Sequence, residues 1–396
     1  MLDISLSNRA QSIKPSPTLA VTARAAELRA EGKDIIGLGA GEPDFDTPEH
    51  IKAAAIEALK KGQTKYTAVD GTADFKKAII NKFKRENNLE YNNNQILVSC
   101  GAKHSLYNLF QAVLNDGDEI IIPAPYWVSY PDMALLAGAV PVTIETTIAD
   151  NFKITPEKLE SAITDKTRML VFNSPSNPTG VSYNKAELAA LGAVVLKYPN
   201  IIVVTDDIYE HILWGQDEFV NIVNACPDLY DRTVVVNGVS KAYSMTGWRI
   251  GYVGGPETII KGMKKIQSQS TSNASSMAQA AAVAALDGDQ TYIEESTVIF
   301  KERHDFVLKS LQAIDGITCI ASEGTFYSFP DMNGLIEKLD GINNDIELAE
   351  FFLEKAEVAM VPGSAFGAPG CMRISFATSM ENLEKSMERI KTAVES

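Results

Sequence analysis

The chain has 396 residues, 45% of them hydrophobic and 22% charged, a composition typical of a folded protein of about two domains. A net charge of −15 argues against nucleic acid and anionic lipid as partners, because a surface of that sign repels them. No apolar run approaches the ~20 residues of a membrane span, and the N-terminus lacks the order of a signal peptide. We therefore expect a cytoplasmic protein that binds neither nucleic acid nor membranes.

The first forty-odd residues contain one helical pattern, over residues 18–30, followed by a loop rich in Gly and Pro at residues 39–48. One helix and a loop are too little chain to bury a core of their own. We therefore expect this segment to pack against another part of the molecule.

In the middle of the chain, short β-branched runs alternate with helical patterns such as residues 103–114 and 185–197. This alternation is typical of an α/β domain with a mostly parallel, doubly wound sheet, in which the helices form the crossovers. The continuous apolar character of the runs indicates burial on both faces. The predicted strands are Ile96–Val98, Glu119–Ile122, Met169–Phe172, Ile201–Thr205, Thr233–Val236 and Arg249–Val253.

From residue 292 onward the pattern changes to that of a smaller α+β domain. A long helical pattern runs to about residue 314, and apolar residues at spacings of four, three and four predict a last helix over residues 383–394. Between them we predict strands near residues 317, 325–329, 358 and 372, and a helix near 346–355. We expect a large α/β domain over residues 48–290, and a small domain built from residues 1–47 and 291–396.

Four cysteines and four histidines are scattered along the chain, without the short spacings of metal-binding or disulfide-rich proteins. We expect the cysteines to be reduced and assign no metal site.

Turns that follow strands hold the candidate chemistry, because ligands of doubly wound sheets bind beyond the carboxyl ends of the strands. After residue 98, a turn with Gly101 precedes a helix and can offer backbone N–H groups to an anion. The same sequence is equally compatible with a simple tight turn that binds no ligand. No phosphate-loop motif occurs, and Glu42 interrupts the glycine fingerprint of dinucleotide-binding proteins.

Lys241 follows another predicted strand, within a largely apolar segment that ends at Arg249. In a partly desolvated pocket the pKa of a lysine falls and its amine becomes nucleophilic, while an arginine fork suits a phosphate dianion. Three further strand ends supply Trp127, Asn177, Asp206 and Tyr209. Groups that stack, hydrogen-bond, pair with a ring nitrogen and bind phosphate together indicate pyridoxal 5'-phosphate.

The sequence resembles the class I/II aminotransferases of fold type I nearly from end to end, and within them the bacterial aspartate aminotransferases of the aspartate/prephenate branch. The resemblance implies a large domain with a mostly parallel seven-stranded sheet between helices, plus a smaller α+β domain. The motifs that carry it are Gly41–Pro48, Ser174–Gly180, Asp206–Tyr209, Ser240–Arg249 and Pro362–Arg373.

The resemblance implies a role for each residue of the cofactor site. Lys241 would hold pyridoxal phosphate covalently and move the substrate α-proton, and Asp206 would pair with the ring nitrogen. Asn177 and Tyr209 would bond the ring oxygen, and Trp127 would stack on the ring. The phosphate would be bound by Gly101, Ala102, Lys103, Ser240, Arg249 and, from a second subunit of a homodimer, Tyr66.

The resemblance also implies the substrate contacts. Arg373 would bind the α-carboxylate next to Gly39, with Trp127 and Asn177 lining the same space. Lys103, Ser16 and Thr18 would select the distal carboxylate of a dicarboxylic substrate. His104 is a further candidate for the pocket lining, and Lys14 for binding the ring carboxylate of prephenate.

The leading functional hypothesis is ping-pong transamination between L-aspartate and 2-oxoglutarate. The first alternative is a prephenate or aromatic amino acid aminotransferase. A non-enzymatic regulator that binds the cofactor is a second alternative, but the chain has neither a spare DNA-binding segment nor a net positive charge. A nicotinamide dehydrogenase would need the glycine fingerprint that is missing.

Overall fold

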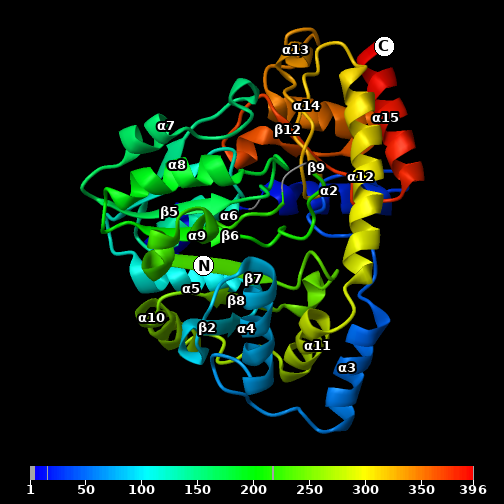
Figure 1. The fold of residues 1–396 in the computed structure, drawn as a ribbon. Coiled ribbons are helices and arrows are strands. Elements are labelled where there is room, and N and C mark those ends of the chain that lie inside the picture. The colour runs from blue at the N-terminus through cyan, green and yellow to red at the C-terminus, as the bar shows by residue number, and fades with distance from the viewer. Residues whose placement is uncertain (1–4, 16, 216–217, 396) are drawn as a thin grey trace.

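The computed structural model describes residues 5–15, 17–215 and 218–395. The middle of the chain forms one seven-stranded sheet with the order β2-β8-β7-β6-β5-β3-β4. Figure 1 labels its strands from β2 to β5 in that order. All neighbouring pairs from β7 to β4 are parallel, and β8 runs antiparallel to both of its neighbours. This confirms the predicted α/β class and the seven-stranded, mostly parallel sheet. The strands are β2 (Ile96–Ser99), β3 (Glu119–Pro123), β4 (Val140–Ile144), β5 (Thr167–Asn173), β6 (Ile202–Asp206), β7 (Thr233–Gly238) and β8 (Gly251–Gly254).

Helices cover both faces of this sheet, which explains the unbroken apolar runs of its central strands. Val203 and Val235 face α4 (Ala73–Asn87), α8 (Lys185–Leu196) and α11 (Ser276–Asp287), whereas Val204 and Val236 face α5 (Ala102–Val113), α6 (Ser129–Leu136) and α10 (Glu257–Ser268). Because the parallel strands point the same way, the residues that follow them meet at one edge of the sheet.

The strands predicted for the large sheet differ from the structure in two places. Sequence reasoning missed β4, an edge strand whose Pro141 and exposed Val140 depart from the continuous apolar run of a central strand. The predicted strand at residues 249–253 begins only at Gly251, because Arg249 has a left-handed backbone with a φ of 56°.

The C-terminal part forms a smaller layer beside the sheet. Its antiparallel strands β11 (Val361–Pro362), β12 (Met372–Ser375) and β9 (Tyr327–Ser328) form one three-stranded sheet. The long helix α12 (Thr291–Gln312) runs from the part of the molecule near α3 up to α15 (Met380–Glu395) (Figure 1). The strand predicted near residue 317 is wrong, since Thr318 makes only an isolated bridge with Asp331.

The N-terminal segment packs on this smaller part, as predicted. Strand β1 (Ile36–Gly37) pairs in parallel with β10 (Val358–Ala359), and Leu38 joins the apolar cluster of α12, α14 (Asp345–Phe351) and α15. Whether the domain boundaries lie at residues 47 and 290 stays a prediction. The remaining helices are α1 (Asn8–Ser12), α2 (Pro17–Ala30), α3 (Glu49–Lys60), α7 (Pro156–Ala162), α9 (Ile222–Ala225) and α13 (Asn333–Ile336).

Within the described ranges, every helix is too short or too polar to cross a membrane.

Candidate active site

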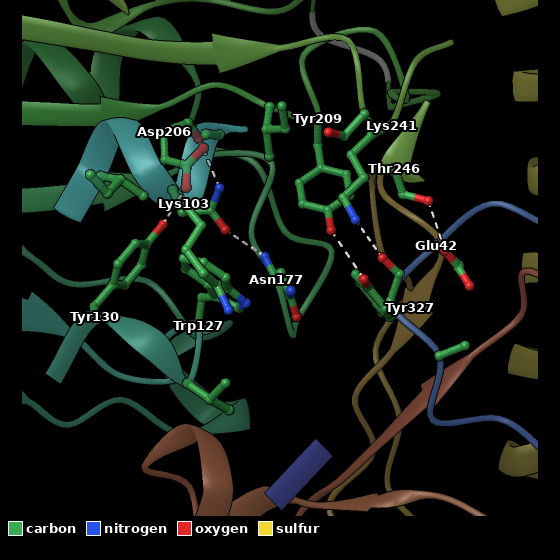
Figure 2. Close-up of a pocket in the computed structure, with 18 of the residues that line it drawn as sticks. Glu42, Lys103, Trp127, Tyr130, Asn177, Asp206, Tyr209, Lys241, Thr246 and Tyr327 are labelled. Atoms are coloured by element: carbon green, nitrogen blue, oxygen red, sulfur yellow. Dashed lines mark hydrogen bonds between the residues drawn. The ribbon is translucent and has the colours of Figure 1, made fainter. Parts of the chain in front are cut away.

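A cavity of about 470 Å³ lies at the edge of the sheet where the parallel strands end. Figure 2 shows Asp206, Tyr130 and Trp127 on one side of it, and Lys241, Tyr209 and Tyr327 on the other. Ten of the residues predicted for the site line this cavity: Ala102, Lys103, Trp127, Asn177, Asp206, Tyr209, Ser240, Lys241, Arg249 and Arg373.

Lys241 follows β7, and its amine donates a hydrogen bond to the backbone carbonyl of Gly41. Its Nζ lies 5.8 Å from the ring centroids of both Tyr209 and Phe326. Burial, assisted by the charge of Arg373, lowers the pKa of Lys241 to about 8. A substantial fraction of the amine is therefore uncharged at slightly alkaline pH, as a nucleophile or general base requires.

Asp206 is the last residue of β6, and one of its two carboxylate oxygens is left without a partner. Oδ2 accepts a 2.7 Å hydrogen bond from the hydroxyl of Tyr130, whereas Oδ1 is buried and has no hydrogen-bond partner among the described residues. Burial raises the pKa of Asp206 to about 6, although the bond from Tyr130 opposes the rise. A buried carboxylate with one unsatisfied oxygen suits a cationic or protonated ligand atom.

The turn before α5 is shaped to receive an anion. Gly101 has a φ of +93°, and a Cβ atom at this position would collide with Nη2 of Arg249. The guanidinium donates to the carbonyls of Thr246, at 2.7 Å, and Cys100, at 3.3 Å, but has no acidic partner in the described part of the chain. A guanidinium without an acidic partner beside a helix N-terminus fits a phosphate group.

Arg373 on β12 approaches the same cavity from the smaller part of the molecule. Its Nη1 donates to Oδ1 of Asn177 at 3.0 Å and its Nη2 to the carbonyl of Gly39 at 2.8 Å. Its Nε is buried without a partner among the residues described, and its guanidinium lies 4.5 Å from the ring centroid of Tyr327. Such an arginine has donors left for a carboxylate.

Lys103 lies in the first turn of α5, with its Nζ 4.8 Å from the ring centroid of Trp127. It forms no salt bridge within the described ranges. Burial, followed by the charge of Arg249, lowers the pKa of Lys103. Two neighbouring cations without an acidic partner favour an anionic ligand between them.

Gly39, Gly101 and Tyr66 were predicted for the site but are not among the described residues that line the cavity. Gly101 and Gly39 lie next to it and contact Arg249 and Arg373 respectively, as described above. Tyr66 is 91% exposed and belongs to the outer surface of the single chain. Ser16 lies outside the described residues, and so does the side chain of Thr18.

Sequence reasoning missed the residues that hold the predicted ones in place. Tyr327 and Tyr209 share a hydrogen bond of 3.0 Å between their hydroxyls. Thr246 donates to Glu42 at 2.7 Å, and Asn173 accepts the backbone N–H of Asn177 (Figure 2 labels all but Asn173). The sequence carried a signal for Asn173, which directly follows a predicted strand, and for Glu42 and Thr246, which lie in the family motifs, but none for Tyr327. His104 faces a neighbouring hollow that shares Lys103 and Arg249 with the main cavity.

Comparison with known proteins agrees with this geometry. Residues 33–390 match the family Aminotransferase class I and II. The aspartate/prephenate aminotransferase of Nitrosomonas europaea is 61% identical, over 97% of this chain and 98% of the relative. The aspartate aminotransferase of Rhizobium meliloti superposes with a TM-score of 0.96 at 48% identity, over 99% of both chains. That of Thermus thermophilus, solved with maleate, has a TM-score of 0.93 at 42% identity, over 98% of this chain and 100% of the other.

Proposed function

The chain belongs to the class I and II aminotransferases, and from this premise we propose that it transfers the amino group of L-aspartate to 2-oxoglutarate. The products are oxaloacetate and L-glutamate, formed in two successive half-reactions. One observation carries the proposal: a single cavity joins Lys241 to three cations, Lys103, Arg249 and Arg373, none of which has an acidic partner among the residues described. A cofactor phosphate and the two carboxylates of aspartate would match these cations.

The family implies dependence on pyridoxal 5'-phosphate, and the residues of the cavity fit that group. Arg249 and the turn at Gly101 and Ala102, with Ser240 and the backbone of Lys103, would hold the phosphate. The unpartnered Oδ1 of Asp206 would face the ring nitrogen, and Trp127 would lie against the ring. When bound, the cofactor supplies a ring that accepts the electron pair left on the substrate α-carbon.

The residues of the chain would perform the remaining work. Arg373 would orient the substrate through its α-carboxylate, with Asn177 and Gly39 holding the guanidinium in place. The amine of Lys241 would then move the proton of the substrate α-carbon to the C4′ carbon of the cofactor, as its lowered pKa allows. Asp206 would keep a proton on the ring nitrogen, and Tyr209, held by Tyr327, would donate to the ring oxygen.

Lys103 would select the second carboxylate of the substrate, together with Ser16 and Thr18 of the N-terminal segment. The aspartate aminotransferase names of the solved relatives and the maleate of the Thermus thermophilus structure support a dicarboxylic substrate. The relatives named aspartate/prephenate aminotransferase favour prephenate as a second substrate. Lys14, whose backbone N–H and charge lie beside Asp132 of α6, would bind its ring carboxylate.

The active unit would be a homodimer in the cytoplasm. Tyr66 supports the dimer, because a tyrosine that is 91% exposed in one chain is available to complete the phosphate site of a second copy.

The test is steady-state kinetics of the purified protein, first with aspartate or phenylalanine as the amino donor to 2-oxoglutarate. Prephenate, which is itself a 2-oxo acid, is then tested as the amino acceptor with aspartate or glutamate as the donor. We expect the highest kcat/KM with aspartate, a measurable value with prephenate, and no turnover by Lys241→Ala. Cofactor binding without turnover of any of these donor and acceptor pairs would instead favour a regulator.

A further inference from the structure

A buried group of charges adjoins the cavity lining through Glu210, which directly follows Tyr209, and takes no part in the function proposed above. Its centre is Lys82 on α4, a lysine with 0% exposure. The amine of Lys82 contacts Oε1 of Glu210, donates to Oδ1 of Asn87 at 2.7 Å, and lies 3.4 Å from Oε2 of Glu86. We call these four residues, Lys82, Glu86, Asn87 and Glu210, the Lys82 cluster. It contains a buried ion pair between Lys82 and Glu210.

Glu210 connects three elements of the fold within this cluster. Its Oε1 also accepts a 2.7 Å bond from the side-chain amide of Asn237, and its Oε2 a 2.6 Å bond from that of Asn87 on α4. Asn237 belongs to β7, four residues before Lys241, and Glu210 directly follows Tyr209. One carboxylate thus joins the turn after β6 to the strand that leads to the reactive lysine.

We propose that Glu210 is a positioning residue that holds the Asp206–Tyr209 turn in register with the segment carrying Lys241. The backbone ladder between β6 and β7 ends where Asp206 is paired with Val236, and a 2.9 Å bond from the N–H of Asp207 to the carbonyl of Val236 extends it by one residue. The inference rests on the proposed function, because only there do Asp206, Tyr209 and Lys241 act on the same ligand.

The charges argue against a purely stabilising role for the cluster. A buried ion pair contributes little net stability over well-packed apolar side chains, because both charges lose their hydration. Glu210 faces not only Lys82 but also the buried carboxyl of Asp207. The pKa of Asp207 is raised to about 8 by burial and by the charge of Glu210. His211 and Glu86 complete the charges around it, with His211 Nε2 2.9 Å from Glu86. Such an arrangement instead fixes the positions of α4, β7 and the turn after β6 relative to one another.

A metal ion is not needed to explain the group. Ligand-type atoms of Glu86, Glu210 and His211 do lie within 4.8 Å of one another. The ammonium of Lys82 already contacts both carboxylates and supplies the positive charge from the chain itself.

Two variants and one control test the inference on the full-length holoenzyme. Glu210→Gln removes the charge of the carboxylate, and Asn237→Ala removes one of its links without changing any charge. Lys76→Met is the control, because it breaks another ion pair of the same helix, that of the buried Lys76 with the partly exposed Asp70 at 2.7 Å, away from the turn. The readouts are the pH titration of the visible absorbance of the bound cofactor and the dissociation constant of the cofactor, at temperatures where circular dichroism shows each variant folded.

We expect Glu210→Gln and Asn237→Ala to weaken cofactor binding about tenfold or more, the effect of losing a hydrogen bond to a charged group, and to shift the absorbance titration. Lys76→Met should change neither. Unchanged titration and affinity in Asn237→Ala would overturn the inference, and this variant decides the question if Glu210→Gln does not fold. A wild-type chain without a visible cofactor band would overturn the proposed function as well, so the two failures are distinguishable.

Discussion

The hydroxyl of Tyr130 donates a 2.7 Å hydrogen bond to Oδ2 of Asp206, while Oδ1 of the same carboxylate has no partner among the residues that the structure describes. Tyr130 lies on α6, three residues after Trp127, and is itself buried. The bond leaves one oxygen of Asp206 oriented by the protein and the other available to a ligand.

Tyr130→Phe removes this bond and little else. We expect the pKa of Asp206 to rise further, because the hydroxyl favours the charged carboxylate, and the affinity for pyridoxal phosphate to fall roughly tenfold. Equilibrium titration of the apoprotein with the cofactor measures this. An affinity equal to that of the wild type would show that Tyr130 only fills space.

Asp206→Asn should stabilise the apoprotein while it abolishes activity. The folded protein raises the pKa of Asp206 from 3.8 to about 6, so the folded state binds more protons than the unfolded state between these values. The free energy of unfolding therefore falls as pH rises from 4 to 6, and the full deficit, about 2–3 kcal/mol, remains above pH 6. Denaturant unfolding of both apoproteins at pH 4, 5, 6 and 7 should show the advantage of the variant growing with pH. A difference in the free energy of unfolding that does not change with pH would contradict the raised pKa of Asp206. Added cofactor should raise the free energy of unfolding of the wild type alone.

Lys103→Met tests the binding site of the second carboxylate. The variant keeps the length of the side chain beside Trp127 but loses its charge. We expect kcat/KM for aspartate to fall roughly 10- to 100-fold, as for a lost charge-assisted hydrogen bond, with a much smaller change for phenylalanine. Equal losses for both amino acids would assign Lys103 to the cofactor rather than to substrate selection.

Tyr66→Phe tests the dimer. An exposed hydroxyl that forms no hydrogen bond within the described part of the chain should be silent in a monomer. We expect light scattering to give the mass of two chains, and the variant to lose cofactor affinity several-fold without a change in its thermal unfolding as apoprotein. A monomeric mass, or unchanged affinity, would remove Tyr66 from the site.

The sequence predicted best what short stretches of chain determine alone. Strands such as β6 and β7 are continuous apolar runs, and Asp206 and Lys241 follow them directly, so alternation and strand ends were enough to place them. The edge strand β4 was missed because Val140 and Thr143 are exposed and Pro141 interrupts it, so its residues do not form such a run. The role of Arg373 came only from family resemblance, since its partners Gly39 and Asn177 are far away in sequence.

The hydrogen bonds and ion pairs that support the site residues could not be predicted either, because they join residues far apart in the sequence. Tyr209 and Tyr327 lie 118 positions apart, and Lys82 and Glu210 lie 128 positions apart. Nothing in the local pattern of Tyr327 distinguishes it from an ordinary core tyrosine, because its hydroxyl gains a partner only when the smaller sheet packs against the large one. A helix pattern with a lysine such as Lys82 likewise predicts a solvated side chain, whereas the fold buries it.

The visible absorbance of the purified protein tests the central claim most directly. We predict that wild-type protein loaded with pyridoxal phosphate has a visible band that shifts when aspartate is added without an acceptor, and returns when 2-oxoglutarate follows. Lys241→Ala should bind the cofactor without this cycle. A wild-type band that does not respond to aspartate, or a full cycle in Lys241→Ala, would contradict aspartate transamination through Lys241.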